Sequence, residues 1–253
     1  MKDLEGKVVL VTGGSTGIGA AAAVAFARQG ARTMVHYNAS KEAAAKVVAE
    51  INAAGGEAQM VGGNVTDLAN VSRVVNETAS RMGRVDILVN NVGSLVKRTL
   101  VRDYSVDLLD EVLAVNVRQL VWFVREASAV MRANGGGNII NTTSIAARNG
   151  GGPGSVLYAA SKGFVSTATR GWARELAPDR IRVNAVSPGV ILTPFHDRFT
   201  TAEQLKAMQA TVPMGRLGEA DECAGTFLYL ASDELSGYVT GQTVAVNGGQ
   251  WMA

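Results

Sequence analysis

Short apolar runs alternate with longer stretches of mixed polar and apolar residues along most of the chain. The runs occupy residues 8–11, 33–35, 87–89, 139–140, 183–186 and 244–246, and a further strand is expected to end before Asn64. Strands buried on both faces read as continuous hydrophobic runs, whereas the stretches 41–54 and 68–82 have the two-sided character of surface helices. We therefore predict a single doubly wound Rossmann domain over residues 1–253, an α/β fold with a parallel sheet of about seven strands and helices on both faces.

One segment, residues 193–217, breaks this alternation. It follows the end of a strand, and open α/β sheets bind their ligands beyond the carboxyl ends of their strands. We expect this segment to be a substrate lid.

Composition and charge narrow the classes of partner. A chain of 253 residues with 47% hydrophobic content can bury a full core as one domain. A formal charge of +2 and 18% charged residues do not provide the dense basic face that binds nucleic acid, so no nucleic-acid partner is expected. Cys223 is the one cysteine, which excludes an internal disulfide and a multi-cysteine metal site. We expect it to be buried in a helix, and we expect no metal.

The first residues lack the apolar core of a signal peptide. No later stretch approaches the roughly 18 uninterrupted apolar residues of a membrane span. We therefore expect a cytoplasmic protein with no membrane partner.

A glycine-rich loop at residues 12–19 follows the first strand and precedes an alanine-rich helical stretch that ends near Gln29. Glycines let the backbone turn tightly and approach a pyrophosphate, and the helix N-terminus beyond them offers free N–H groups. The glycines alone would also fit an ordinary strand-to-helix turn. Their place between a strand and a helix favours a dinucleotide site.

Tyr158 and Lys162 lie four residues apart at the start of a helical stretch that reaches Ala177, so both side chains point to one face. A free phenol has a pKa of about 10, and an adjacent ammonium favours the phenolate and lowers that pKa. Such a pair suits proton transfer to and from a substrate oxygen. Taken alone, it would also fit a surface packing pair.

Further motifs occur in a set order. They are N-N-V-G at 90–93, Asn116 within L-A-V-N-V, Ser144 at a strand end, Y-A-A-S-K at 158–162 and P-G-V-I-L-T at 188–193. Together with T-G-G-S-T-G-I-G at 12–19, they resemble the short-chain dehydrogenase/reductase family over essentially the whole chain. The chain is similar to 3-oxoacyl-[acyl-carrier-protein] reductase-like and glucose dehydrogenase-like members.

The resemblance implies a role for each matching residue. Tyr158 would donate and accept the proton, Ser144 would hydrogen-bond the reacting oxygen, and Asn116 would hold a water for proton relay. Lys162 would bind the nicotinamide ribose and lower the pKa of the phenol. The implied cofactor-binding residues are Gly13, Ser15, Thr16, Gly17, Ile18, Gly19, Tyr37, Asn38, Ser40, Asn64, Val65, Asn90, Gly93, Tyr158, Lys162, Pro188, Gly189, Ile191 and Thr193.

Two departures from the family pattern bear on the site. The stretch between Ser144 and Tyr158 is one residue longer than usual, which the glycines at 150–154 could absorb, and Thr143 is the alternative to Ser144. Asn64 stands where the family usually has an Asp against the adenine, although an amide oxygen can still accept a hydrogen bond from the adenine amino group.

The end of the second strand bears on the choice of nicotinamide cofactor. An NAD site commonly has an acidic residue there, which binds the ribose 2′-OH and repels a 2′-phosphate. Here Asn38 and Ser40 offer neutral donors, and the first carboxylate is Glu42. We therefore favour NADP(H) over NAD(H), although Thr16 stands where many NADP-preferring relatives carry Arg or Lys, and dual use stays open.

The predicted function is hydride transfer between NADP(H) and a carbonyl or secondary alcohol, with a ketone or 3-oxoacyl thioester as the substrate. The loops expected around the nicotinamide, 94–99, 145–155 and 195–208, combine apolar side chains with Lys97, Arg98, Arg148 and Arg198. This mixture fits an apolar slot with a cationic rim, or simply solvated loop charge. The neutral hydrogen-bonding side chains in these loops are few, chiefly Ser94, Asn149 and His196.

Two alternatives remain beside a small-molecule reductase. A sugar or polyol dehydrogenase of the same family shares all the motifs above. An inactive cofactor-sensing regulator would be expected to have lost Tyr158 or Lys162, and both are present. The resemblance also implies a homotetramer, with helix pairs from 105–131 and 158–177 and a contact near Trp251.

Overall fold

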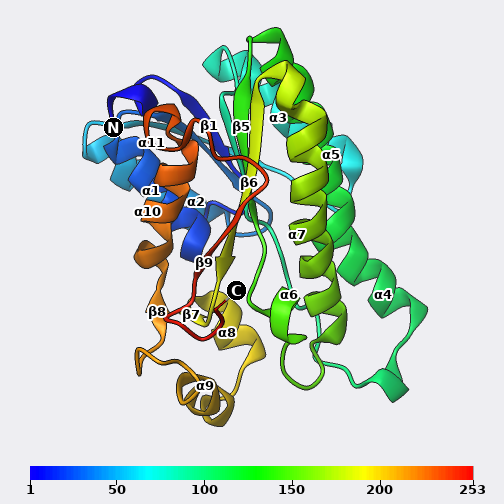
Figure 1. Cartoon of the computed structure of the whole chain (residues 1–253). Helices are drawn as coiled ribbons and strands as arrows, with labels where there is room; N and C mark the ends of the chain where they lie inside the picture. Colours follow the sequence, from blue (N-terminus) through cyan, green and yellow to red (C-terminus); the bar gives the residue numbers. More distant parts are fainter. Residues whose placement is uncertain (253) are drawn as a thin grey trace.

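The computed structural model describes residues 1–252, and its main sheet confirms the predicted doubly wound architecture (Figure 1). Seven parallel strands lie in the order β3-β2-β1-β4-β5-β6-β9. Their bounds are β1 Val8–Val11, β2 Arg32–Tyr37, β3 Glu57–Gly62, β4 Ile87–Asn90, β5 Gly137–Thr142, β6 Ile181–Pro188 and β9 Thr243–Val246. The strand order reverses between β1 and β4, which is where such sheets bind ligands.

Helices cover both faces of this sheet (Figure 1). The α-helices are α1 Gly17–Arg28, α2 Lys41–Ala53, α3 Leu68–Met82, α4 Val106–Leu113, α5 Gln119–Ala133, α6 Ala146–Asn149, α7 Val156–Leu176, α8 Pro194–Phe199, α9 Ala202–Gln209, α10 Ala220–Ala231 and α11 Asp233–Ser236. Short 3-10 turns lie at Lys2–Leu4, Val101–Asp103 and Ala177–Asp179, and a π-helical turn at Ala114–Arg118 joins α4 to α5.

Two apolar cores hold the layers together. On one face, α1, α2 and α10 pack on the sheet around Phe26 and Phe227. On the other face, α3, α5 and α7 pack around Phe123 and Met131. Cys223 is buried in the first core, as expected, and this burial raises the pKa of its thiol to about 12.

The 193–217 segment lies beyond the carboxyl ends of the strands, at the bottom of Figure 1. It holds α8 and α9, and its two ends are tied together by the parallel pair β7 Ile191–Leu192 and β8 Gly218–Glu219. Its position therefore depends on a small sheet of its own, which is separate from the main sheet.

Nowhere in residues 1–252 is a helix both long and apolar enough to cross a membrane. The same residues contain no group of three or more His, Cys, Asp or Glu side chains that could share a metal ion.

Candidate active site

A cavity of about 710 Å³ opens at the carboxyl ends of the strands. Its wall combines the glycine loop after β1, the loops that follow β2 to β6, and the 193–217 segment. No Asp or Glu side chain from the described part of the chain lines it. The cavity is therefore suited to an anionic ligand rather than a cationic one.

The glycine loop forms one end of this cavity, where Gly13, Ser15, Thr16, Gly17 and Ile18 line the wall. Gly13 and Gly17 have φ values of 62° and 54°, a backbone conformation that favours glycine. The first turn of α1 contains no acidic residue, and its N-cap residue makes no side-chain capping bond. Free N–H groups and the positive end of the helix dipole are therefore available to a phosphate.

Gly19 serves the loop in a different way. It does not line the cavity, and a Cβ atom at this position would collide with the carbonyl oxygen of Gly13. Gly19 thus permits α1 to pack closely against the loop.

Two residues that the sequence analysis missed hold the loop in place. Asn91 Nδ2 donates to the carbonyl oxygens of Thr12 and Gly13, both at 3.2 Å. Gly13 N donates to Nδ1 of His36 at 3.2 Å, and His36 Nε2 lies 2.9 Å from the carbonyl oxygen of Gly63. Since a backbone N–H only donates, Nδ1 is the acceptor and the proton sits on Nε2. Burial lowers the pKa of His36, which favours this neutral form.

The end of β2 presents Asn38, Ala39 and Ser40 to the cavity, but Tyr37 is not on its wall. The Tyr37 ring lies against Gly62 and the first apolar core, so the structure places it away from the expected cofactor position. Neighbouring strand residues point to opposite faces, and this alternation turns His36 toward the loop instead.

Asn64 and Val65 line the cavity as expected. The Asn64 Oδ1 atom, however, already accepts from Thr66 N at 3.1 Å and Thr66 Oγ1 at 2.9 Å. The oxygen that was expected to contact an adenine is therefore engaged within its own turn.

Asn90 and Asn116 lie behind the cavity rather than on its wall, while Gly93 lines it. Asn90 Nδ2 donates to Asn141 Oδ1 at 2.9 Å within the sheet. Asn116 Oδ1 accepts from Ser94 N at 3.0 Å, and its Nδ2 donates to the Ser94 carbonyl at 2.8 Å. Asn116 therefore fixes the backbone next to Gly93.

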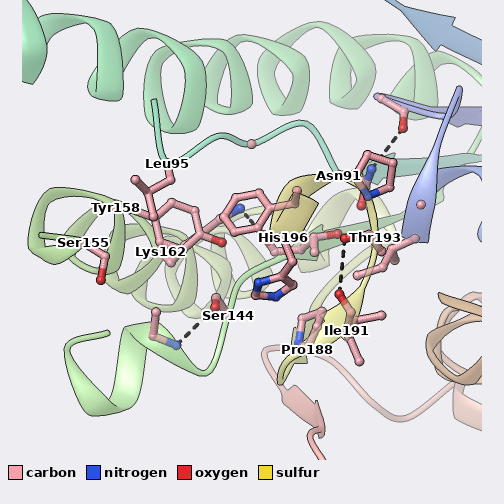
Figure 2. Close-up of a pocket in the computed structure, with 18 of the residues that line it drawn as sticks. Asn91, Leu95, Ser144, Ser155, Tyr158, Lys162, Pro188, Ile191, Thr193 and His196 are labelled. Carbon is pink, nitrogen blue, oxygen red and sulfur yellow. Dashed lines mark hydrogen bonds between the residues drawn. The ribbon is translucent and has the colours of Figure 1, made fainter. Parts of the chain in front are cut away.

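Ser144, Tyr158 and Lys162 meet on the cavity wall, and Figure 2 shows the three side chains around one space. Ser144 lies in the short loop between β5 and α6, and the other two lie on the first turns of α7. The neighbouring Thr143 hydroxyl instead bonds the Lys162 carbonyl and Ser166, both at 2.8 Å, which leaves Ser144 as the hydroxyl facing the phenol.

Burial dominates the proton affinities of this group. It raises the pKa of Tyr158 to about 12, which the neighbouring Ser144 hydroxyl opposes, and it lowers the pKa of Lys162 to about 8. The downward shift of the phenol pKa that the sequence analysis expected is absent in the protein alone. The Lys162 ammonium lies 5.8 Å from the centre of the phenol ring and donates to the Thr142 carbonyl at 2.8 Å.

The loop before Tyr158 contains several glycines with left-handed backbone. Gly150, Gly151 and Gly154 all have positive φ values, and α6 forms immediately before them. The loop is anchored from outside by Arg98, which donates to the carbonyl oxygens of Pro153 at 3.1 Å and Phe199 at 2.7 Å. Of the four cationic side chains expected at the rim, Arg98 lines the cavity, whereas Lys97, Arg148 and Arg198 do not.

The remaining expected residues, Pro188, Gly189, Ile191 and Thr193, all line the cavity, and Thr193 begins the 193–217 segment. Pro188, Ile191 and Thr193 are labelled in Figure 2. Thr193 Oγ1 donates to the Ile191 carbonyl at 3.3 Å. A dinucleotide fits this set of residues, because the glycine loop and uncapped α1 suit its phosphates and the buried Lys162 suits ribose hydroxyls.

Comparison with known proteins agrees with this geometry. The family model described as Enoyl-(Acyl carrier protein) reductase matches residues 13–250. The chain is 39% identical to the 3-oxoacyl-[acyl-carrier-protein] reductase FabG of Thermotoga maritima, over 97% of this chain and 98% of that protein.

Two solved structures extend the comparison. A short-chain type dehydrogenase/reductase from Mycobacterium marinum is 35% identical with a TM-score of 0.93, covering 98% of this chain and 96% of that one. An NADH-dependent reductase, A1-R', responsible for alginate metabolism is 33% identical with a TM-score of 0.91, and each chain is fully covered (100%). The protein thus belongs to the short-chain dehydrogenase/reductase family and is an NAD(P)-dependent oxidoreductase that acts on CH–OH groups.

Proposed function

We propose that this enzyme is a ketone reductase that favours NADP(H) and accepts 3-oxoacyl thioesters. The observation that carries the proposal is the placement of Ser144, Tyr158 and Lys162 on a cavity that continues to the glycine loop, with no lining carboxylate from residues 1–252. The relative named 3-oxoacyl-[acyl-carrier-protein] reductase supports this substrate class.

The reaction follows from the positions of these side chains. A bound nicotinamide supplies the hydride, which adds to the carbonyl carbon. Tyr158 gives its proton to the carbonyl oxygen as the C=O double bond becomes a C–O single bond, and Ser144 hydrogen-bonds that oxygen as its charge develops. Because Tyr158 holds its proton tightly in the protein alone, reduction starts from the protonated phenol that it requires.

The cofactor preference rests on the end of β2. Asn38 and Ser40 are exposed on the cavity wall, and the Ser40 hydroxyl makes no capping bond to α2. These free donors at a helix N-terminus suit a 2′-phosphate. The relative titled as NADH-dependent is the reason to measure both cofactors.

The substrate end favours a ketone over a polyol. Its wall includes the apolar Leu95, Ile145, Phe195 and Met208. Neutral polar side chains also line this end of the cavity, in larger number than expected from the sequence. Several of them form hydrogen bonds within their own segments. Asn149 accepts from Gly151 N, Ser155 donates to the Gly152 carbonyl, and Gln204 accepts from Thr201 N. A polyol site would instead direct such groups toward each substrate hydroxyl.

We also propose that residues 193–217 act as the substrate lid and that the enzyme is a homotetramer. Apolar side chains are exposed on α4 and α7, at Val106, Leu109, Val156 and Phe164, and Trp251 is exposed near the C-terminus. A second copy of the chain would cover them. Light scattering at micromolar concentration should give four chains per particle, and a monomer would contradict the proposal.

One assay tests the proposed function. NADPH and NADH absorbance should be followed with 3-oxoacyl thioesters, simple ketones, sugars and polyols. We expect the highest kcat/KM for a ketone or 3-oxoacyl thioester with NADPH. Robust oxidation of glucose or a sugar alcohol without ketone reduction would show instead that the enzyme is a sugar or polyol dehydrogenase.

A further inference from the structure

We infer that His196 is a substrate-binding residue that donates a hydrogen bond from Nε2 to a second oxygen of the substrate, close to the reacting carbonyl. The inference rests on the proposed function, because the thioester carbonyl of a 3-oxoacyl substrate is such an oxygen. It assigns the enzyme to substrates with two neighbouring oxygen functions, rather than to ketones in general.

The position of His196 is the first argument. It lies in the first turn of α8, where its backbone N–H donates to the Thr193 carbonyl at 2.9 Å. Its imidazole lines the same cavity as Ser144 and Tyr158, and Figure 2 shows the three side chains around this space. A substrate whose carbonyl reaches the two hydroxyls would therefore place its next atoms against this ring.

The imidazole is also held in one orientation. His196 Nδ1 lies 2.9 Å from Thr200 Oγ1, one helical turn later. The Phe195 ring packs edge-to-face against the imidazole, with the two ring centres 5.4 Å apart. The same Phe195 ring also packs against the Tyr158 ring, at 5.6 Å between the ring centres. One phenylalanine thus braces both the proton donor and the histidine, and a side chain fixed in this way loses little freedom when it binds a ligand.

The proton on the ring then has a defined place. Burial and the neighbouring Arg98 charge lower the pKa of His196, and Asp197 opposes them. The neutral imidazole carries one proton, and we infer that the Thr200 hydroxyl donates to Nδ1, which leaves that proton on Nε2. No hydrogen-bond partner for Nε2 is found among residues 1–252. A purely structural role for His196 would explain the hydrogen bond at Nδ1 but would give the N–H group at Nε2 no function.

Two substitutions separate a binding role from a packing role. His196→Phe keeps the aromatic contact with Phe195 and removes the N–H group. His196→Gln places an amide N–H at a similar reach, so it should restore the donor. The probes are the 3-oxobutanoyl thioester of N-acetylcysteamine and 2-heptanone, a ketone without a second oxygen.

We expect the ratio of kcat/KM for the thioester to that for 2-heptanone to fall about 10- to 100-fold in the Phe variant, mostly through KM for the thioester. The Gln variant should keep this ratio within about 3-fold of the unmodified enzyme, since it retains the donor. Thermal unfolding midpoints check that both variants fold.

Either of two results would contradict the binding role of His196. A Phe variant that folds and keeps the ratio, or a Gln variant that loses it as fully as the Phe variant, would overturn the role of His196 while leaving ketone reduction in place. If the unmodified enzyme reduces neither probe, the proposed function fails first.

Discussion

The two ends of the cavity each contain a histidine, and the two histidines differ in how they are used. His36, at the cofactor end, is almost fully buried, and both ring nitrogens bond backbone groups of neighbouring loops. His196, at the substrate end, is partly exposed, and the structure pairs one ring nitrogen. The first histidine holds a fixed loop, whereas the second leaves one ring nitrogen without a hydrogen-bond partner among the described residues.

The backbone segments at the two ends of the cavity differ in the same way as the two histidines. At the cofactor end, the half-buried Asn91 side chain holds the glycine loop against the sheet. At the substrate end, Arg98 links its own loop to two other segments through the backbone carbonyl groups of Pro153 and Phe199. In the same loop Val96 has a φ of 65°, which is rare for a β-branched residue. A rigid cofactor platform thus faces a substrate wall that can vary without disturbing the sheet.

The largest expected effect comes from Tyr158, the proposed proton donor. Tyr158→Phe should reduce turnover by a factor on the order of 10²–10⁴, because it removes the proton donor alone. The dissociation constant for NADPH, measured by fluorescence, should change little. Near-normal turnover in this variant would exclude Tyr158 as the proton donor.

The burial of the charged Lys162 side chain should lower the free energy of unfolding of the enzyme. The pKa of Lys162 falls from 10.5 to about 8 on folding, so the unfolded chain binds the proton more tightly. The free energy of unfolding should therefore rise with pH between about 8 and 10.5, as the buried amine loses its charge. Lys162→Met removes this penalty, which is at most about 3 kcal/mol, and should be inactive but more stable at pH 7.

Urea unfolding at pH 7 and pH 9.5 measures this effect. The stability gained through Lys162→Met should shrink at the higher pH. Above pH 10 the free energy of unfolding should fall with pH, because Tyr158 in the folded protein then retains a proton that the unfolded chain releases. The exposed Lys46→Met is the control and should show no such pH dependence. A Lys162→Met variant that is less stable at both pH values would contradict the interpretation.

Local sequence patterns predicted the parts of this site that are built within one element. The spacing of Tyr158 and Lys162 lies within α7, and the glycine loop joins β1 directly to α1. The missed contacts join distant elements: His36 to Gly13, and Asn91 to the same loop. The alternation of side chains in β2 could have separated His36 from Tyr37. Within residues 1–252 the Nε2 atom of His196 has no hydrogen-bond partner, which depends on the packing of α8 and is not encoded by any local spacing.

A smaller effect tests the cofactor end. Asn38→Asp places a carboxylate near the expected 2′ position, where it accepts from a ribose hydroxyl and repels a phosphate. We expect the ratio of kcat/KM for NADPH to that for NADH to fall about 10-fold, the equivalent of roughly 1.4 kcal/mol. The kcat with NADH should stay close to normal. Equal or better activity of the unmodified enzyme with NADH would contradict the proposed preference.

The smallest effect tests the substrate end, at the strained turn of Val96. The turn is closed by Lys97 N, which donates to the Leu95 carbonyl at 2.8 Å, and by Val96 N, which donates to Ser94 Oγ at 3.0 Å. Left-handed backbone in a β-branched residue costs on the order of 1–3 kcal/mol, and glycine removes that strain while losing roughly 0.5–1 kcal/mol in chain entropy. Val96→Gly should therefore stabilise the fold by about 1 kcal/mol.

The same substitution should loosen the substrate wall. Leu95 and Arg98 both line the cavity from this loop, so a freer turn should lower kcat/KM for the substrate about 3-fold and leave the Kd for NADPH unchanged. Val101→Gly is the control, because Val101 is exposed and has no positive φ; it should be neutral or slightly destabilising. If Val96→Gly destabilised the protein as much as the control does, the turn would hold no strain, and the position of Leu95 and Arg98 would have to be set by the Arg98 hydrogen bonds alone.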